Sequence, residues 1–412
     1  MNAGGNISLK LCFPSVLFPA VSNFFIMFFS PQSSYLNSNF IFITSFRHYS
    51  TAERGPMQGG NITDLYIYDP DINQLGVIDG YSSLRWRRRF FEPGEVELHC
   101  PATAENLALL AEGNIIHRLD RLEAAIVEGV SVATTDSGDE ITVTARMGSS
   151  MLDQRIITPT INFSGTVEDA IRKVISDNTI TARPLPHLIL GAAGGYSPTC
   201  AFQATGKDVL TVCEALGRAA PLGFRARLDI PEKQWISEVY DGLDRTVTQT
   251  ARPYVLFSDE FRNISNPAYT LNTAGYANYA YVAGEGEGAA RVIIEVDQTN
   301  GEPRREMWVD ARDLQQGELT VTDYQAQLYQ RGIEKLAEAA KVESFGADAV
   351  DTQNFQYLID WDMGDIVSFE KWGLRLDQRI TEVEEVYEGG TVTITPVCGT
   401  PLPETLNLGS DT

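Results

Sequence analysis

The residue types that most often carry out catalysis are few and scattered in this chain of 412 residues. The five cysteines form no Cys-x-x-Cys pair, and none of the four histidines stands at the spacing of a metal ligand. Zinc sites need such clustered ligands, and disulfide scaffolds need a higher density of cysteines. We therefore expect reduced and buried thiols, no histidine-based catalytic site, and no metal or cofactor.

The segment His117–Asp120, with the sequence HRLD, resembles the start of the catalytic loop of a protein kinase. A kinase also needs a glycine-rich loop, a strand lysine and a downstream Asp-Phe-Gly that holds magnesium. The sequence contains no such set of motifs. The segment instead predicts the edge of a strand, with Arg118 and Asp120 in solvent.

The segment Gly284–Gly288, with the sequence GEGEG, is rich in glycine like a phosphate-binding loop. A phosphate cradle offers backbone N–H groups and often a lysine, whereas Glu285 and Glu287 would repel the anion. We expect the tip of a β-hairpin here.

The acidic cluster DWDMGD contains Asp360, Asp362 and Asp365, whose carboxylates could bind calcium. The twelve-residue loop that closes with a bidentate glutamate is missing, however. The simpler prediction is a turn at Met363–Gly364 between two strands, with a metal site as the alternative.

A basic stretch in an acidic chain is the strongest local feature. In the sequence LRWRRRF, Leu84 and Trp86 alternate with Arg85, Arg87 and Arg89, which predicts a half-buried strand with the arginines on one face. The basic residues Arg85, Arg87, Arg88 and Arg89 could contact DNA, or they could pair with the acidic face of a neighbouring subunit. The overall charge of the chain favours the second role.

The elements around these residues are mainly strands. Period-two patterns and turn residues predict strands over residues 62–148, 224–298 and 357–396. A helix is predicted after the N-cap Thr166, a second in the sequence GKDVLTVCEALGRAAPLGF, and a long third from about Thr322 to Ser344. We expect each of the first two helices to pack on a small sheet.

Length and charge limit the classes of function. The chain has 43% hydrophobic residues, enough for several cores, and a net charge of −23. Residues 1–56 carry Lys10, Arg47 and Arg54 against Glu53, so residues 57–412 carry −25. Most of the surface should therefore repel DNA and anionic lipid, and we expect no stable association with membranes.

The first 56 residues differ in composition from the rest of the chain. They are nearly uncharged and rich in Phe, Ser and Asn, but Pro14 and Pro19 interrupt the apolar run that a signal peptide or a spanning helix would need. We expect translation to begin at Met57, with an export or membrane signal and a docking arm as alternatives.

The predicted domains are interleaved, because no internal repeat or low-complexity linker separates them. They are an N-terminal extension (1–56), a β-rich module (57–155), an α/β insert (156–235), strands followed by the long helix (236–345), a C-terminal β-barrel-like module (346–400) and a polar tail (401–412).

Several stretches in order resemble the hub proteins of siphovirus tails, which are related in fold to the baseplate hubs of contractile tails. The stretches include YSSLRWRRRFFEPGEVELHCPA, GTVEDAIRKVI, VLTVCEALGRAAPLGFRARLD, YANYAYVAGEGEG, EPRREMWVDARDL and DWDMGDIVSF followed by QRITEVEEVYEGG. The resemblance spans roughly residues 60 to 400, and the ordered set is more specific than any single stretch.

The resemblance implies a mainly β, α+β fold with β-barrel-like modules and α/β inserts, assembled as a trimeric ring. Such a hub closes the tail tube, joins it to the receptor-binding tip and lets DNA pass on infection. The implied partners are two further copies, the tail tube or distal tail ring, and a tip or tape-measure protein, with DNA only in transit. The implied location is the virion tail, after synthesis in the cytoplasm of the host bacterium.

A ring protein needs exposed residues at its subunit interfaces. The candidates are Arg85, Trp86, Arg87, Arg89, Trp361 and Trp372.

Two other functions remain open on the sequence. The chain could be a cell-wall hydrolase carried on the tail, although 55 acidic residues make any one carboxylate pair uninformative. It could also be a host-binding module. The hub prediction expects neither hydrolysis nor tight adsorption to cells.

Overall fold

Alternating apolar and polar side chains make strands the main element of the chain, as expected from the sequence. The computed structural model describes residues 63–135, 138–350, 352 and 355–399. These residues belong to one compact unit, Pro56–Thr412. The predictions for residues 1–56, for the start at Met57 and for the tail 401–412 lie outside the described residues.

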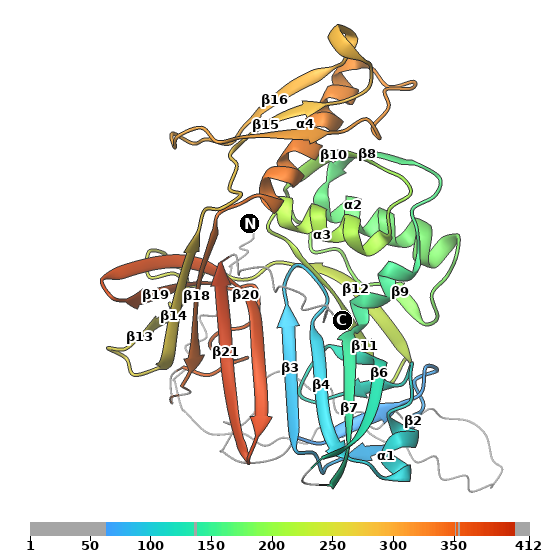
Figure 1. Cartoon of the computed structure of the whole chain (residues 1–412), viewed down its shortest axis with the longest axis vertical. Coiled ribbons are helices and arrows are strands. Elements are labelled where there is room, and N and C mark those ends of the chain that lie inside the picture. Colours follow the sequence, from blue (N-terminus) through green and yellow to red (C-terminus); the bar gives the residue numbers. More distant parts are fainter. Residues whose placement is uncertain (1–62, 136–137, 351, 353–354, 400–412) are drawn as a thin grey trace, which may run out of the picture. The chain divides into compact units, whose positions relative to one another are not determined.

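Thirteen strands form the largest sheet (Figure 1). Its first group is β1 (Leu65–Tyr68), β2 (Gln74–Ile78), β3 (Ser83–Arg89), β4 (Glu95–Pro101), β5 (Ile115–His117), β6 (Ala124–Thr135) and β7 (Gly138–Met147). Its second group is β13 (Leu256–Ser258), β14 (Ile264–Asn272), β18 (Val342–Ala349), β19 (Ile366–Lys371), β20 (Leu374–Glu388) and β21 (Thr391–Gly399).

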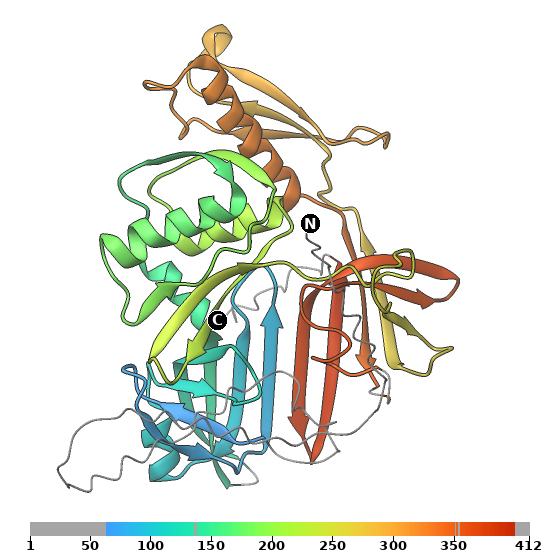
Figure 2. The ribbon, with the colours of Figure 1, turned by 180° about the vertical axis from the view of Figure 1, so that it is seen from behind.

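The two groups join where β20 pairs with β3 in antiparallel register. The main path of the sheet runs β14-β18-β21-β20-β3-β4-β7-β6-β5-β1-β2, while β19 and β13 branch from β20. The path ends at β14 and at β2, so the described strands form an open sheet and not a closed barrel. Figure 2 shows the two groups side by side from behind.

Each group of strands covers its own hydrophobic core on one face. Leu84, Trp86 and Leu98 belong to the core of the first group. Phe345, Phe369 and Val383 belong to the core of the second. Because side chains alternate along a strand, the opposite face of the shared sheet is left to polar residues.

The α/β insert follows the first group. It contains β8 (Ile161–Thr166), α2 (Val167–Ile175), β9 (Leu188–Leu190), β10 (Thr199–Ala204), α3 (Val209–Ala219), β11 (Gly223–Asp229) and β12 (Gln234–Tyr240). Thr166 and Asp208 accept hydrogen bonds from backbone N–H groups at the starts of α2 and α3, as N-caps do. Both predicted helices are confirmed, and both contact the small sheets of the insert.

A second insert contains β15 (Tyr279–Ala283), β16 (Ile293–Asp297), β17 (Glu306–Asp310) and α4 (Val321–Glu338). The hairpin predicted at Gly284–Gly288 is confirmed, because this segment connects the antiparallel strands β15 and β16. The long helix ends at Glu338 and not near Ser344. Residues 342–349 instead pair with β14 and β21, so tertiary pairing outweighs their helical pattern.

The sequence prediction missed one short helix, α1 (Ala104–Leu109), whose N-cap is Thr103. It also missed the 3-10 helices Gly148–Gln154 and Gly288–Ala290 and the π-helix Ser176–Thr181. The predicted boundary at residues 345 and 346 falls inside β18, and β14 of the preceding predicted domain pairs with β18 on both sides of this boundary.

Candidate functional site

A ladder of ion pairs occupies the polar face of the large sheet where its two groups of strands meet. In register, Arg87 on β3 lies between Glu384 on β20 and Glu95 on β4, while Arg85 lies opposite Glu97 on β4 and Arg89 lies opposite Glu382 on β20. The closest contacts are Arg85 Nε to Glu384 at 2.7 Å, Arg89 Nη1 to Glu95 at 2.8 Å and Arg87 Nε to Glu382 at 3.4 Å.

The ladder continues across β4, β7 and β6. Arg146 on β7 pairs with Glu128 at 2.7 Å and with Asp153 at 2.8 Å. A groove of about 440 Å³ follows this row. The carboxylates on the polar face of β20, β4, β7 and β6 outnumber the guanidinium groups: Glu382, Glu384, Glu388, Glu95, Glu97, Glu140 and Glu128 stand against Arg85, Arg87, Arg89 and Arg146. We call this surface the ladder face.

A buried charge network lies behind the ladder, on the core side of the same strands. Glu385 has no exposed surface and accepts hydrogen bonds from Arg118 at 3.0 Å and from Arg121 at 2.9 Å. Burial alone would raise the pKa of Glu385, but attraction to the two guanidinium groups outweighs it and lowers this pKa to about 2. The carboxylate is therefore ionised in the folded protein at neutral pH.

Arg88 forms the second half of this network and connects distant parts of the chain. Its guanidinium group donates to Glu123 at 2.9 Å, to Asp362 at 2.7 Å and to the Tyr357 hydroxyl at 2.8 Å. Burial acts to raise the pKa of Glu123, but Arg88 and then Arg225 hold it at about 2. Because Arg225 lies on β11, the network joins both strand groups to the α/β insert. We call these residues, with Glu385 and its partners, the buried junction.

The prediction for Arg118 was wrong. Its side chain is fully buried between the rings of Trp86 and Tyr387, with its guanidinium carbon 5.4 Å and 4.9 Å from their centroids. The segment HRLD leads from β5 toward β6 on the core side of the sheet, where Arg118 contacts Trp86 and Tyr387. Its Arg118, and Arg121 directly after it, are thereby brought to Glu385, which lies far away in the sequence.

The six predicted interface residues lie in three kinds of surroundings. Trp86 and Trp361 are 0% and 1% exposed and belong to the two cores. Trp372 is 57% exposed at the tip of the β19–β20 hairpin. The three arginines contact glutamates of their own chain. A role at a subunit interface stays a prediction for all six, and exposure favours Trp372.

The aspartates of DWDMGD are engaged within the chain. Asp362 binds Arg88, Asp365 accepts from Arg245 Nε at 2.9 Å, and Asp360 accepts from the backbone N–H of Gln356 at 2.8 Å. The predicted turn at Met363–Gly364 is present, followed by β19. Among the described residues, no group of three or more His, Cys, Asp and Glu side chains could hold a metal ion.

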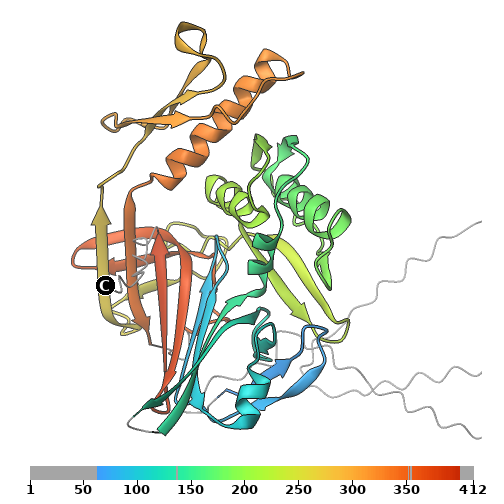
Figure 3. The same ribbon diagram turned by 45° about the vertical axis from the view of Figure 1, so that its right-hand side comes forward.

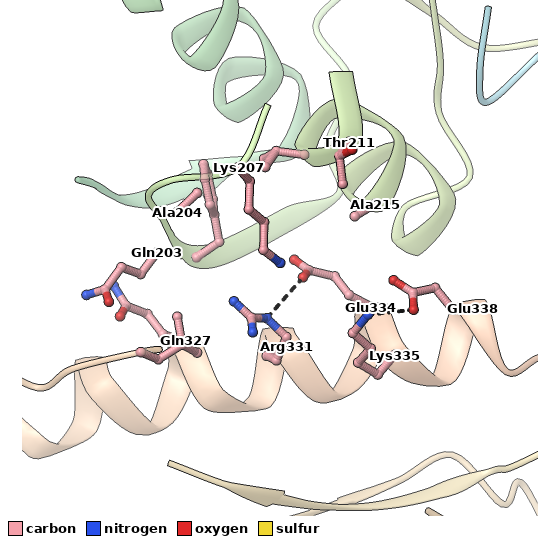
Figure 4. A pocket seen from close by; sticks show the side chains of 13 residues that line it. Gln203, Ala204, Lys207, Thr211, Ala215, Gln327, Arg331, Glu334, Lys335 and Glu338 are labelled. Carbon is pink, nitrogen blue, oxygen red and sulfur yellow. Dashed lines mark hydrogen bonds and ion pairs between the residues drawn. The ribbon is translucent and has the colours of Figure 1, made fainter. Parts of the chain in front are cut away.

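A small cavity of about 70 Å³ lies between α3 and α4, where the two inserts meet (Figure 4). Arg331 in its wall pairs with Asp313 at 3.0 Å and Glu334 at 3.7 Å. Burial raises the pKa of Glu334 and lowers the pKa of Lys207. Since the arginine has carboxylate partners within the chain, we assign the cavity to the contact between the inserts and not to a ligand.

Comparison with solved structures identifies the fold. The fold is that of phage tail proteins: it matches the 43 kDa tail protein of prophage MuSo2 from Shewanella oneidensis with a TM-score of 0.53 and 11% identity, over 82% of this chain and 98% of that one. It also matches a tail protein from Neisseria meningitidis MC58 with a TM-score of 0.51 and 12% identity, over 82% of this chain and 96% of that one.

A family model then places the chain more narrowly. Residues 64–400 match the model of the Siphovirus ReqiPepy6 Gp37-like proteins, so the chain belongs to this family of siphovirus tail proteins. No curated protein matches the chain. In the described residues, no helix is both long and apolar enough to cross a membrane.

Proposed function

We propose that this tail protein is the hub at the tip of the tail, where three copies form a ring that closes the tail tube. The observation that carries the proposal is the antiparallel pairing of β20 with β3. This pairing makes one sheet from two groups of strands, with the cores on one face and charged side chains on the other. A sheet of this kind suits the wall of a channel.

In the proposed ring, the ladder face lines the channel and DNA passes along it during infection. Carboxylates outnumber guanidinium groups on this face, and the arginines have glutamate partners within the chain. Such a surface repels the phosphates of DNA at short range, and its guanidinium groups are already paired with carboxylates. DNA would therefore slide along the channel without binding to its wall.

The proposed partners follow from the position of a hub. The tail tube or distal tail ring lies on one side of the ring, and a tip, receptor-binding or tape-measure protein lies on the other. The protein would be made in the cytoplasm of the host and function in the virion tail.

We expect the protein to catalyse no reaction of its own. Glu123 and Glu385 of the buried junction are held ionised by arginines, whereas a glycosidase needs one carboxylic acid with a raised pKa beside a carboxylate. Purified protein should release no soluble fragments from bacterial cell walls. Release of fragments that is lost in a single Asp or Glu variant would favour the hydrolase instead.

The first test is the mass of the purified protein in solution, measured by light scattering over a range of concentration and salt. We expect a trimer, and electron microscopy of the same sample should show rings. A protein that stays a monomer at all concentrations, and that also fails to form rings on isolated tail tubes, would overturn the proposal.

A further inference from the structure

We propose that the sheet continues from one copy to the next, with the distal half of β6 pairing with β14 of the neighbouring copy. This inference rests on the proposed ring and names the two strand edges that would build it.

The first edge is the distal half of β6. β5 covers β6 only at Ala124–Ile126, and the backbone of Val127 bonds to Gly113 and Asn114. From Gly129 to Thr134, β6 pairs with β7 on one side, and within the described residues no backbone hydrogen bond reaches the other side of this stretch. Along such an edge, every second residue points its N–H and C=O groups away from the sheet.

The second edge is β14, at the other end of the sheet path. It pairs with β18, and no described residue bonds to the backbone of Ala268–Leu271 on its other side. Pro267 and a register shift interrupt the start of this strand. Because these features discourage pairing, the regular stretch Ala268–Asn272 is the part that can accept a further strand.

The directions of the strands fit this pairing. From β14 through β18, β21, β20, β3, β4 and β7 to β6, every pairing is antiparallel. The strand at one end of this series therefore runs opposite to the strand at the other end. When copies are arranged head to tail, β6 and β14 meet in antiparallel orientation, and the alternation is unbroken around the ring.

The side chains at the two edges also match. Val130 and Val132 lie opposite the buried Val143 and Ile141, so they point to the core face of the sheet, yet they are 39% and 52% exposed. Leu271, which is 54% exposed, points to the same face on β14. Pairing of the edges would bring these apolar side chains together and remove them from water.

Charge identifies a second copy as the partner. The stretches Gly129–Thr135 and Ala268–Asn272 contain no charged residue, although the chain has a net charge of −23. Two acidic copies can approach along uncharged edges with little repulsion. The edges of the small sheet differ, since β16 carries Glu295 and Asp297, and β17 carries Glu306 and Asp310.

The two edges are displaced along the strand direction, as a closed ring of tilted strands requires. When the register is followed from strand to strand, Ser131 on β6 is level with Glu388 on β20, whereas Tyr269 on β14 is level with Ile380 on β20. Eight residues of strand correspond to roughly 26 Å. Closing a sheet into a ring needs tilted strands and such a displacement between its two ends. Figure 3 shows the β6–β7 hairpin at the lower end of the sheet.

Cysteine cross-linking of the full chain tests the pairing. In a Cys12→Ser background, the double variant Ser131→Cys/Thr270→Cys should give covalent dimers and trimers with a short bis-maleimide, because the other four cysteines are buried. Either single variant should give none. A dimer from Ser131→Cys alone would mean that β6 pairs with β6, which overturns the head-to-tail arrangement.

Charge substitutions provide an independent test. Val130→Lys and Leu271→Glu should each convert the trimer to a monomer in light scattering, while the circular dichroism spectrum is unchanged. The double variant should recover the trimer, because it places Lys beside Glu at each contact. Val321→Lys, at a 59% exposed position on α4, is the matched control and should remain a trimer.

The outcomes separate this inference from the proposed function. A wild-type trimer that neither substitution disrupts, and that the cysteine pair does not cross-link, would overturn the pairing and leave the ring intact. A wild-type protein that forms no ring at all would overturn both.

Discussion

At the scale of single residues, the informative side chains are charged residues on the apolar faces of strands. Glu385 shares a face with Val383 and Tyr387, and Arg88 shares a face with Leu84 and Trp86. Alternation predicts a polar side chain on the other face, so each is an exception to its strand's pattern. Their burial follows because each finds partners of opposite charge.

Removal of the charge of Glu385 tests the buried junction. Glu385→Gln leaves the buried Arg118 and Arg121 with less negative charge beside them. We expect a loss of about 3–5 kcal/mol in the free energy of unfolding, measured with urea. Glu388→Gln, on the exposed end of the same strand, should change it by less than about 0.5 kcal/mol. Equal effects of the two substitutions would contradict the assignment.

The same carboxylate predicts how stability depends on pH. The pKa of Glu385 is about 2 in the folded protein and has an ordinary value of 4.5. Its ionised form therefore stabilises the fold fully above pH 4.5, and this contribution is lost as the pH falls toward 2. Urea unfolding between pH 7 and pH 3 should show a steeper loss for the wild type than for Glu385→Gln. Parallel curves would rule out this contribution.

At the scale of elements, the pairing of β20 with β3 decides how the chain is organised. The arginines of β3 bind glutamates that follow almost three hundred residues later, such as Glu384, which is 297 positions from Arg87. Local pattern predicts both strands and the faces of their charged residues. It does not predict that they are neighbours, because pairing partners depend on the path of the whole chain.

Gly332 offers a test of how α4 packs on its sheet. Alanine normally stabilises a helix relative to glycine by about 1 kcal/mol. A Cβ atom at this position would lie 2.5 Å from Val296 Cγ2 and 2.8 Å from Val282 Cγ2, however. We expect Gly332→Ala to lower the melting temperature, because the strand must move away from the helix.

The reciprocal control is Ala326→Gly on the exposed side of α4, which should cost about 1 kcal/mol through helix propensity alone. If Gly332→Ala raised the melting temperature, propensity would outweigh the contact and the helix would not pack this closely.

At the scale of the whole molecule, net charge is the property that follows most directly from the amino-acid composition. The net charge of −23 predicts weak interaction with nucleic acid. The structure adds that the basic stretch of β3 is matched by glutamates of β20 and β4, so it does not form a basic patch.

Binding of duplex DNA tests this charge arrangement. The wild type should show no binding to labelled duplex in fluorescence anisotropy at physiological salt. Glu97→Lys together with Glu388→Lys should produce weak binding that disappears as salt increases. A matched double variant outside the ladder face, Glu302→Lys with Glu306→Lys, controls for net charge. Tight binding by the wild type would exclude the proposed channel lining.

Sequence alone determined the strand-rich class, two helices and the N-cap Thr166 of the first, the turn at Met363–Gly364 and the resemblance to siphovirus tail proteins. These features depend on local periodicity, on capping side chains, or on an ordered set of stretches, and all of them can be read along the chain. The end of α4 and the burial of Arg118 could not be read this way.

Only the tertiary structure decided which charges are buried, which are exposed and which strands share a sheet. Trp86 and Trp372 are the same residue type, yet one fills a core and the other lies at a hairpin tip. The physical reason is that burial and ion pairing depend on distances between residues far apart in sequence. Those distances exist only after β3 and β20 meet and bring Arg118, Arg121 and Glu385 together.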